Sequence, residues 1–190
     1  MLVLVLGLIL FFVPHSLKMA VPGPRAAFIE TRGEGPWKGV VAVPSLIGIG
    51  LMIWGWMLYR DSAPEIFTPP GWGVHAAALS NLIALILLMM SSGPVGRIKT
   101  FVRHPMSLGV AAWGLGHLVS NGDLASILLF GLWTVYAIVA AVVATPRGDP
   151  RPTFQSYRGD VVPTVIGLVL YFLFVSFLHG WMFNTPLPMA

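Results

Sequence analysis

Long runs of apolar residues, separated by short polar segments, set the pattern of this sequence. A helix that spans the hydrocarbon core of a bilayer needs roughly 20 mostly apolar residues, and the runs are close to this length. They cover residues 1–17, 39–59, 72–91, 105–120, 124–145 and 161–184. The pattern therefore predicts an all-α fold: an integral membrane bundle of about six transmembrane helices, in a single transmembrane domain over residues 1–190.

Turn-forming residues mark several ends of these runs. Pro69-Pro70-Gly71 precedes the third run, and Pro105 opens the fourth, a place where proline costs no internal hydrogen bond. The fourth run ends at Ser120-Asn121-Gly122-Asp123, which is rich in turn formers. Because so few residues join the fourth and fifth runs, we expect these two helices to form an antiparallel hairpin.

Composition agrees with a membrane location. Hydrophobic residues make up 56% of the 190 residues and charged residues 9%, against about 25% charged residues in a typical soluble domain. The chain contains no cysteine, which excludes disulfides, iron–sulfur clusters and covalently attached c-type haem. A metal or haem would need His, Met or oxygen ligands. The basic residues are spread over short loops, so we expect the lipid bilayer, and no nucleic acid, as a partner.

The basic residues alternate between the two ends of the predicted helices. The second loop holds only Arg60, and the first, third and fifth loops hold the other Lys and Arg residues. These are Lys18, Arg25, Arg32, Lys38, Arg97, Lys99, Arg103, Arg147, Arg151 and Arg158. Loops rich in Lys and Arg stay in the cytoplasm, so we expect both termini on the periplasmic side of a bacterial inner membrane (N-out/C-out). No basic segment precedes the first run, unlike in a secretory signal peptide, so we expect this helix to be retained.

The predicted topology gives each of the five histidines a depth in the membrane. His15 and His104 lie near the cytoplasmic side, and His75, His117 and His179 lie near the periplasmic side. His104 and His117 are separated by about 20 Å along one helix and by roughly 140° around its axis, so one metal cannot bind both. Any site must therefore take a histidine from another helix.

Haem ligation is the functional hypothesis for these histidines. A b-type haem needs two imidazoles on facing helices, or one imidazole and an open position. By depth alone, His15 pairs best with His104, and His117 pairs best with His75 or His179. The alternative for a single interfacial histidine is a hydrogen-bonded anchor.

Cations and small residues near these histidines bear on the same hypothesis. Arg103 and Lys18 lie in the cytoplasmic layer, where they would face haem propionates. The fourth run supplies small residues beside which a flat macrocycle could lie: Gly109, Ala111, Ala112, Gly114 and Gly116. Small residues in membrane helices also permit close helix packing, which is the alternative explanation for them.

Two motifs around these histidines resemble the NnrU family of bacterial membrane proteins. The first is Phe11-Phe12-Val13-Pro14-His15-Ser16. The second is Arg103-His104-Pro105-Met106-Ser107-Leu108-Gly109, followed by Trp113, His117-Leu118 and Asn121-Gly122-Asp123-Leu124-Ala125-Ser126. The resemblance covers nearly the whole chain. It implies a role in nitrogen-oxide or denitrification metabolism, because the family's name comes from genes linked to nitrite and nitric oxide reduction.

The plant relatives of this family are 15-cis-zeta-carotene isomerases, which look like b-haem enzymes with histidine ligands in the same motifs. The resemblance therefore implies His15 and His117 as haem ligands, and isomerase-type redox chemistry on a hydrophobic small molecule. The predicted topology instead puts these two histidines near opposite faces of the membrane, whereas ligands of one haem need a common depth. Staggered or re-entrant helices would reconcile the two, as would His104 as the partner of His15.

Two other functions stay open. The Arg103-His104-Pro105 element, with Gly109, also resembles isoprenylcysteine and phospholipid methyltransferases of membranes, where it helps to bind S-adenosylmethionine. Those families carry paired Glu residues later in the chain, and the corresponding stretch here, residues 155–160, has none. The third hypothesis is a non-catalytic assembly factor that partners a respiratory complex.

Overall fold

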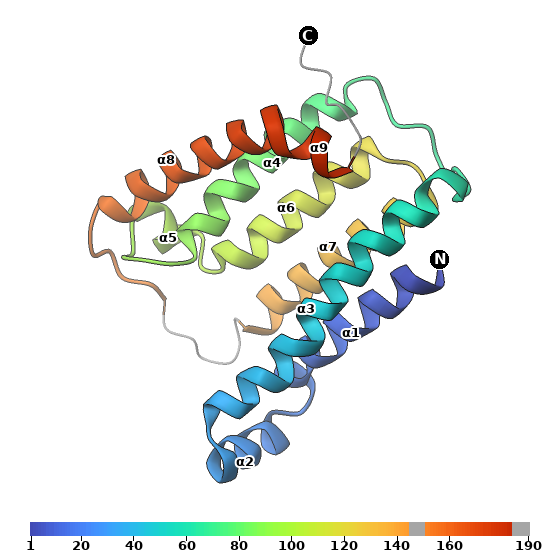
Figure 1. The fold of residues 1–190 in the computed structure, drawn as a ribbon. Coiled ribbons are helices and arrows are strands. Elements are labelled where there is room, and N and C mark those ends of the chain that lie inside the picture. The colour runs from blue at the N-terminus through green and yellow to red at the C-terminus, as the bar shows by residue number, and fades with distance from the viewer. Residues whose placement is uncertain (145–150, 184–190) are drawn as a thin grey trace. The chain divides into compact units, whose positions relative to one another are not determined.

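The computed structural model describes residues 1–144 and 151–183, except for the side chain of Lys18. Arg147 and the last residues of the fifth and sixth predicted runs therefore lie outside the described part. Within it the chain is helical and forms no strand. The α-helices are α1 (Leu2–Ala20), α2 (Pro22–Arg32), α3 (Glu34–Tyr59), α4 (Gly73–Met90), α5 (Arg97–Phe101), α6 (Pro105–Ser120), α7 (Leu124–Ala144), α8 (Arg158–Leu173) and α9 (His179–Phe183) (Figure 1). A short 3₁₀ helix at Arg60–Ser62 follows α3, and a π-helix at Phe174–Leu178 joins α8 to α9.

Each predicted apolar run forms a helix, which confirms the all-helical prediction. Four segments are long and apolar enough to cross a membrane: Glu34–Ser62, Gly73–Met90, Leu124–Ala144 and Arg158–Phe183. A fifth follows if α1 and α2, which are bent by 81°, make one broken span. The 16 residues of α6 fall short of the roughly 20 that a bilayer needs. The described chain is thus that of a membrane protein, and six spans remain a prediction.

Helices α2 and α5 lie in segments that the sequence pattern assigned to loops. Helix α2 has Pro22 in its first turn, where proline is well tolerated. Because α2 contains glycine, prolines and charged residues, it does not form a long apolar run and the pattern does not predict it. Helix α5 has only five residues. Helix α3 begins at Glu34, about one and a half turns before the predicted start at Gly39.

The chain divides into two compact units. The first is Met1–Ile66 with Asp123–Leu129, and the second is Phe67–Gly122 with Phe130–Ala190. His15 belongs to the first unit, and His75, His104, His117 and His179 belong to the second.

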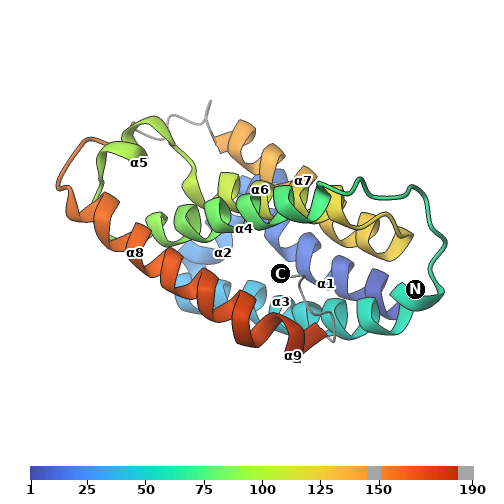
Figure 2. The ribbon, with the colours of Figure 1, turned by 90° about the horizontal axis from the view of Figure 1, so that it is seen from above.

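In the first unit α1 and α3 run side by side (Figure 2). Glycines on both helices bring their backbones together: a Cβ atom on Gly48 would lie 2.8 Å from the carbonyl oxygen of Gly7, and one on Gly55 would fall on the main chain of Leu4. Leu4, earlier on α1 than Gly7, contacts Gly55, which is later on α3 than Gly48. The two helices are therefore antiparallel. Small residues permit such close packing in membranes.

In the second unit α4 packs against both α6 and α8 (Figure 1). Gly109 of α6 lies against the carbonyl oxygen of Ala84, where a Cβ atom would be 2.9 Å away, and Gly167 of α8 lies against Ile86. Ser80 of α4 donates a hydrogen bond to the carbonyl oxygen of Ala112, with an oxygen–oxygen distance of 2.5 Å. Close backbone packing and a polar contact thus hold α4 and α6 together.

The start of α8 is tied to the segment before α5. Asp160 accepts hydrogen bonds from the backbone N–H groups of Arg97 and Ile98 at 2.7 and 2.9 Å. Gln155 accepts one from Val95 N–H at 3.0 Å. The carboxylate of Asp160 therefore caps the first turn of α5, whose N–H groups have no partner within the helix.

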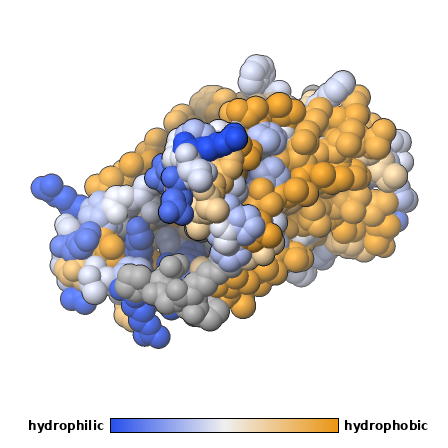
Figure 3. All heavy atoms as spheres, turned by 90° about the horizontal axis from the view of Figure 1, so that it is seen from below, coloured by the Kyte–Doolittle hydropathy of each residue, from blue (hydrophilic) through white to orange (hydrophobic). Residues whose placement is uncertain are grey.

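Many large apolar side chains lie on the surface of the described helices. Among them are Leu46, 70% exposed, Val142, 64% exposed, and Trp181, 81% exposed. The space-filling view shows broad, contiguous hydrophobic areas on the face in sight (Figure 3). Soluble monomers rarely expose apolar patches of this extent, so these helix faces suit contact with lipid.

Candidate functional site

His15 lies on α1 in a fixed orientation. Its Nδ1 atom is 2.9 Å from the carbonyl oxygen of Phe11, one turn earlier, and 3.2 Å from Oγ of Ser45 on α3. The Ser45 hydroxyl donates its own hydrogen to the carbonyl oxygen of Val41. Since a carbonyl oxygen can only accept, the neutral imidazole carries its proton on Nδ1 and its lone pair on Nε2.

Packing positions the partners of His15. The ring of Phe11 stacks on the imidazole, with centroids 4.1 Å apart and an interplanar angle of 14°. Gly48, one turn after Ser45 on α3, lies against the backbone N of Phe11, where a Cβ atom would be 2.9 Å away. This close approach of α1 to α3 brings the buried Ser45 within reach of the imidazole.

A hollow of about 590 Å³ lies beside His15 in the first unit. Charged and aromatic side chains of α2 and of the first turns of α3 line one part of it: Arg25, Glu34, Trp37 and Lys38. Apolar side chains further along α3, such as Leu46 and Ile49, line the rest. The hollow therefore combines an ionic part with an apolar part, and it borders the imidazole.

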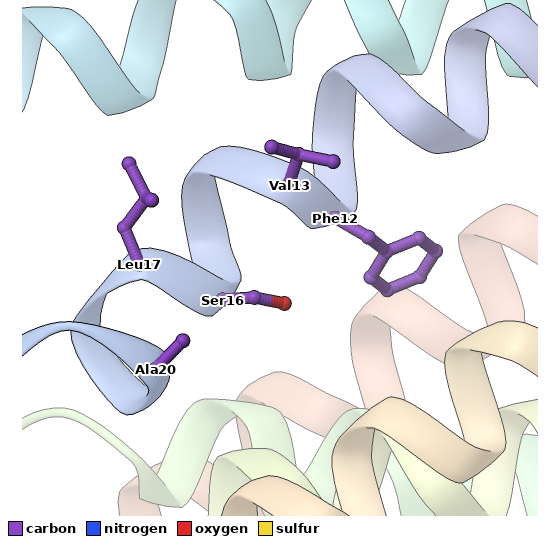
Figure 4. Close-up of a pocket in the computed structure, with 5 residues that line it drawn as sticks. All are labelled: Phe12, Val13, Ser16, Leu17 and Ala20. Atoms are coloured by element: carbon purple, nitrogen blue, oxygen red, sulfur yellow. The ribbon is translucent and has the colours of Figure 1, made fainter.

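A second, smaller hollow of about 290 Å³ lies along the last turns of α1. Its lining consists of Phe12, Val13, Ser16, Leu17 and Ala20 (Figure 4). Val13 and Leu17 extend from one side of the helix and Phe12 from the other (Figure 4). Ser16 supplies the hydroxyl group among these lining side chains, and the others are apolar.

His117 lies on α6 in an arrangement that resembles that of His15. Its Nδ1 atom is 2.8 Å from the carbonyl oxygen of Trp113, one turn earlier, so the lone pair again lies on Nε2. The ring stacks on Phe130 of α7, with centroids 4.3 Å apart and an interplanar angle of 21°. The carbonyl oxygen of His117 accepts a hydrogen bond from the side-chain amide of Asn121 at 2.8 Å, which closes the end of α6.

The small residues of α6 are occupied by helix packing. Gly109 and Gly116 lie against α4, and Gly114 lies against Phe130 and Thr134 of α7. His117 contacts Phe130 of α7, and Gly114, one turn earlier on α6, also contacts Thr134, one turn later on α7. The two helices are therefore antiparallel, which confirms the predicted hairpin. For these three glycines close packing is therefore the correct explanation, and they leave no space for a flat macrocycle against their side of α6.

His179 is the histidine that the structure brings towards His117. It follows the π-helix at Phe174–Leu178 and lies close enough to His117 for an electrostatic interaction. Its ring contacts Phe174 and Phe183, with centroids 5.8 and 5.3 Å away. His75, the other predicted partner, is exposed in the first turn of α4. π-helices often occur at functional sites, so His179 joins the candidate residues around His117.

His104 and Arg103 lie just before α6. His104 is the N-terminal cap residue, and its carbonyl oxygen accepts the N–H of Leu108 at 3.0 Å. His117 lies on the same helix, about 20 Å further along, so the prediction that one metal cannot bind both holds. In the described part of the chain no three His, Asp or Glu side chains gather as a metal site would require. Gln155 and Asp160, in the stretch that corresponds to the Glu pair of the methyltransferases, bind the backbone of residues 95–98 instead.

The sequence model of a family described as NnrU protein matches residues 3–187, nearly the whole chain. The chain belongs to the NnrU family. This confirms the family suggested by the motifs around His15 and His117. No curated protein and no solved structure matches the chain of this NnrU protein.

Sequence reasoning found both stacked histidines of this NnrU protein but not their partners. Ser45 lies inside an apolar run. The one sequence signal for its contact with α1 is that Ser45, Gly48 and Gly55 lie on the same face of a helix. Arg25 and Trp37 were assigned to a loop. Their place beside His15 follows from the bend between α1 and α2, which no local pattern encodes.

Proposed function

We propose that this NnrU protein binds b-type haem in the bacterial inner membrane, and that His15 and His117 would hold its iron. The observation that supports the proposal is the arrangement shared by the two imidazoles. In each, Nδ1–H donates to the carbonyl oxygen four residues earlier, and the ring is stacked on a phenylalanine. Metal-binding histidines commonly donate their other N–H in this way, which fixes the tautomer and raises ligand basicity.

The surroundings of His15 also fit a haem. The neighbouring hollow has apolar walls for a macrocycle and cations for its acid groups. Its one lining carboxylate, Glu34, pairs with the ammonium group of Lys38 at 3.3 Å, and Arg25 is a further cation of the lining. At His117 the fit rests on the imidazole itself and on the aromatic side chains of Trp113 and Phe130 around it.

The chain's own residues would hold and orient the cofactor. The backbone bonds and stacked rings keep each imidazole from turning, so that Nε2 points in one direction. When bound, a haem supplies an iron that changes oxidation state or ligation, which suits isomerisation of a substrate double bond or chemistry on nitrogen oxides. The resemblance to the plant isomerases and the family's link to denitrification favour these two reaction classes.

The absorption spectrum of the protein purified in detergent tests the proposal. We expect a Soret band in protein from haem-replete cells and its loss or a clear shift in His15→Ala and in His117→Ala, because each substitution removes one ligand nitrogen. His75→Ala is the matched control, since His75 is exposed in the first turn of α4, and it should leave the band unchanged. A colourless wild-type protein would contradict the proposal.

The haem content of the same samples separates two forms of the proposal. If the imidazoles share one iron, the wild type holds one haem per chain and either variant loses the six-coordinate spectrum. If each binds its own haem, the wild type holds two and each variant keeps one. If His104 is the partner of His15, His104→Ala changes the spectrum in place of His117→Ala, and the ligand assignment is wrong.

We also propose six spans with both termini in the periplasm. Four spans meet the requirements of length and hydropathy, and α1 and α6 complete the alternation of basic loops. The absence of cysteine makes the native chain a background for single-cysteine labelling. With a membrane-impermeant maleimide, Ser62→Cys, after α3, should react in intact spheroplasts. Gly35→Cys, in the first turn of α3, should react only after lysis. The reverse pattern would overturn the orientation.

A further inference from the structure

The hollow beside His15 is lined by a cation, Arg25, with one buried donor atom that has no hydrogen-bond partner among the described residues. Nε of Arg25 is buried and has no hydrogen-bond partner there. The guanidinium carbon lies 5.9 Å from the centroid of the Trp37 ring, which holds the side chain by a cation–π contact. A buried donor on a charged group is costly when it lacks an acceptor, so Arg25 is arranged to meet an anion.

The nearest carboxylate of the lining is already engaged. Glu34 pairs with Lys38, one turn later on α3, at 3.3 Å, and both side chains are well exposed. Among the described residues, Arg25 is then the cation of the lining that is not paired with a carboxylate. An exposed pair of this kind contributes little to stability, so it would yield readily to an incoming acid group.

The rest of the lining defines the remainder of such a ligand. Beyond the charged first turns of α3, the hollow is bordered by Phe11, Val41, Leu46 and Ile49. Tryptophan and arginine are typical of the membrane–water interface, and aliphatic residues of the hydrocarbon layer. A ligand that spans both parts must therefore be apolar along most of its length and carry an acid at one end.

We propose that this hollow binds an apolar molecule with a carboxylate, and that the carboxylate is held by Arg25. Two sources supply this chemistry. One is a propionate of the haem at His15, in which case the inference rests on the proposed function. The other is a free fatty acid from the membrane. A charge-assisted hydrogen bond to a guanidinium is roughly twice as strong as a neutral one, so Arg25 contributes about tenfold to affinity.

The test compares each acid with its uncharged counterpart on wild type and Arg25→Gln. Haem is compared with haem dimethyl ester by absorbance titration, and laurate with dodecanol by calorimetry. Arg25→Gln should weaken binding of the acid by about tenfold and leave the ester or alcohol unchanged. Arg32→Gln is the matched control, because it removes the same charge from the same helix without lining the hollow.

The outcomes are separable. A selective loss for haem identifies the propionate as the ligand group, and a selective loss for laurate identifies a lipid acid. If haem fails to bind to any variant, the proposed function fails, while the laurate comparison still decides the role of Arg25. Equal losses for acid and uncharged ligand, or no binding of either acid to the wild type, would overturn the inference. Arg25→Lys keeps the charge and should restore part of the affinity for the acid. This recovery would show that the loss in Arg25→Gln comes from the missing charge and not from a folding defect.

Discussion

The two stacked histidines reach the same orientation by different means. His15 stacks on Phe11 of its own helix, one turn earlier, and has an additional partner in Ser45. His117 stacks on Phe130 of the neighbouring helix α7. The His15 stack therefore needs only that α1 be helical, whereas the His117 stack needs α6 and α7 to be packed. A local arrangement and a tertiary one can thus present an imidazole in the same way, with different sensitivity to mutation.

The largest expected effect comes from forcing α6 and α7 apart. A Cβ atom on Gly114 would lie 2.9 Å from the carbonyl oxygen of Phe130, so Gly114→Leu overpacks this interface and should destabilise the protein by about 3 kcal/mol. Thermal unfolding in detergent measures the loss. Gly131→Leu on α7 is the control, because open space surrounds that glycine. Equal effects of the two substitutions would show that α6–α7 packing does not govern the His117 region.

A smaller effect is expected from Ser45→Ala, which removes the hydroxyl partner of His15, for which the described residues show no counterpart at His117. The bond from His15 Nδ1 to Phe11 remains, so the ring should stay in place while its support weakens. Loss of such a supporting hydrogen bond lowers metal or cofactor affinity by about tenfold at the lower end of measured effects. Haem titration measures it, with Ser16→Ala as control. Unchanged affinity in Ser45→Ala would mean that the Phe11 carbonyl alone fixes the imidazole.

The smallest expected effect is the difference in stability between substitutions of the two stacked phenylalanines. Phe11→Leu and Phe130→Leu each remove a stacked ring, which is worth about 1 kcal/mol beyond its buried area. Phe130 also contacts Trp113, with centroids 5.0 Å apart, so Phe130→Leu should lower the unfolding temperature more than Phe11→Leu does. A larger decrease for Phe11→Leu would reverse the comparison between local and tertiary stacking.

The helices were predictable from sequence because each apolar run carries its own signal. Residues 105–120 and the Ser120–Asp123 turn appear in the structure as predicted, since Pro105 starts α6 and Asn121 closes it. Helix α2 was not predictable in the same way, because its stability comes from contacts with α1 and α3 and not from a long apolar run. The π-helix before His179 likewise has no sequence signal.

The histidines of the candidate site were predictable from sequence, but the side chains that surround them were not. His15 and His117 were found by their place in apolar runs, and their bonds to carbonyl oxygens four residues earlier are a property of a single helix. Arg25 beside Trp37 depends on a bend of 81° between α1 and α2. Depth in the membrane selects Lys18 and Arg103 as the cations, whereas the cations among the lining residues of the His15 hollow are Arg25 and Lys38.

The bond between Asp160 and the backbone of Arg97 and Ile98 has a consequence for the order of synthesis. The first turn of α5 leaves the ribosome more than sixty residues before the carboxylate that caps it. Until the start of α8 has been made, the basic segment that carries Arg97 and Lys99 lacks the contact that holds it in its final form. The start of α8 therefore completes a loop that was synthesised much earlier and that is proposed to be cytoplasmic.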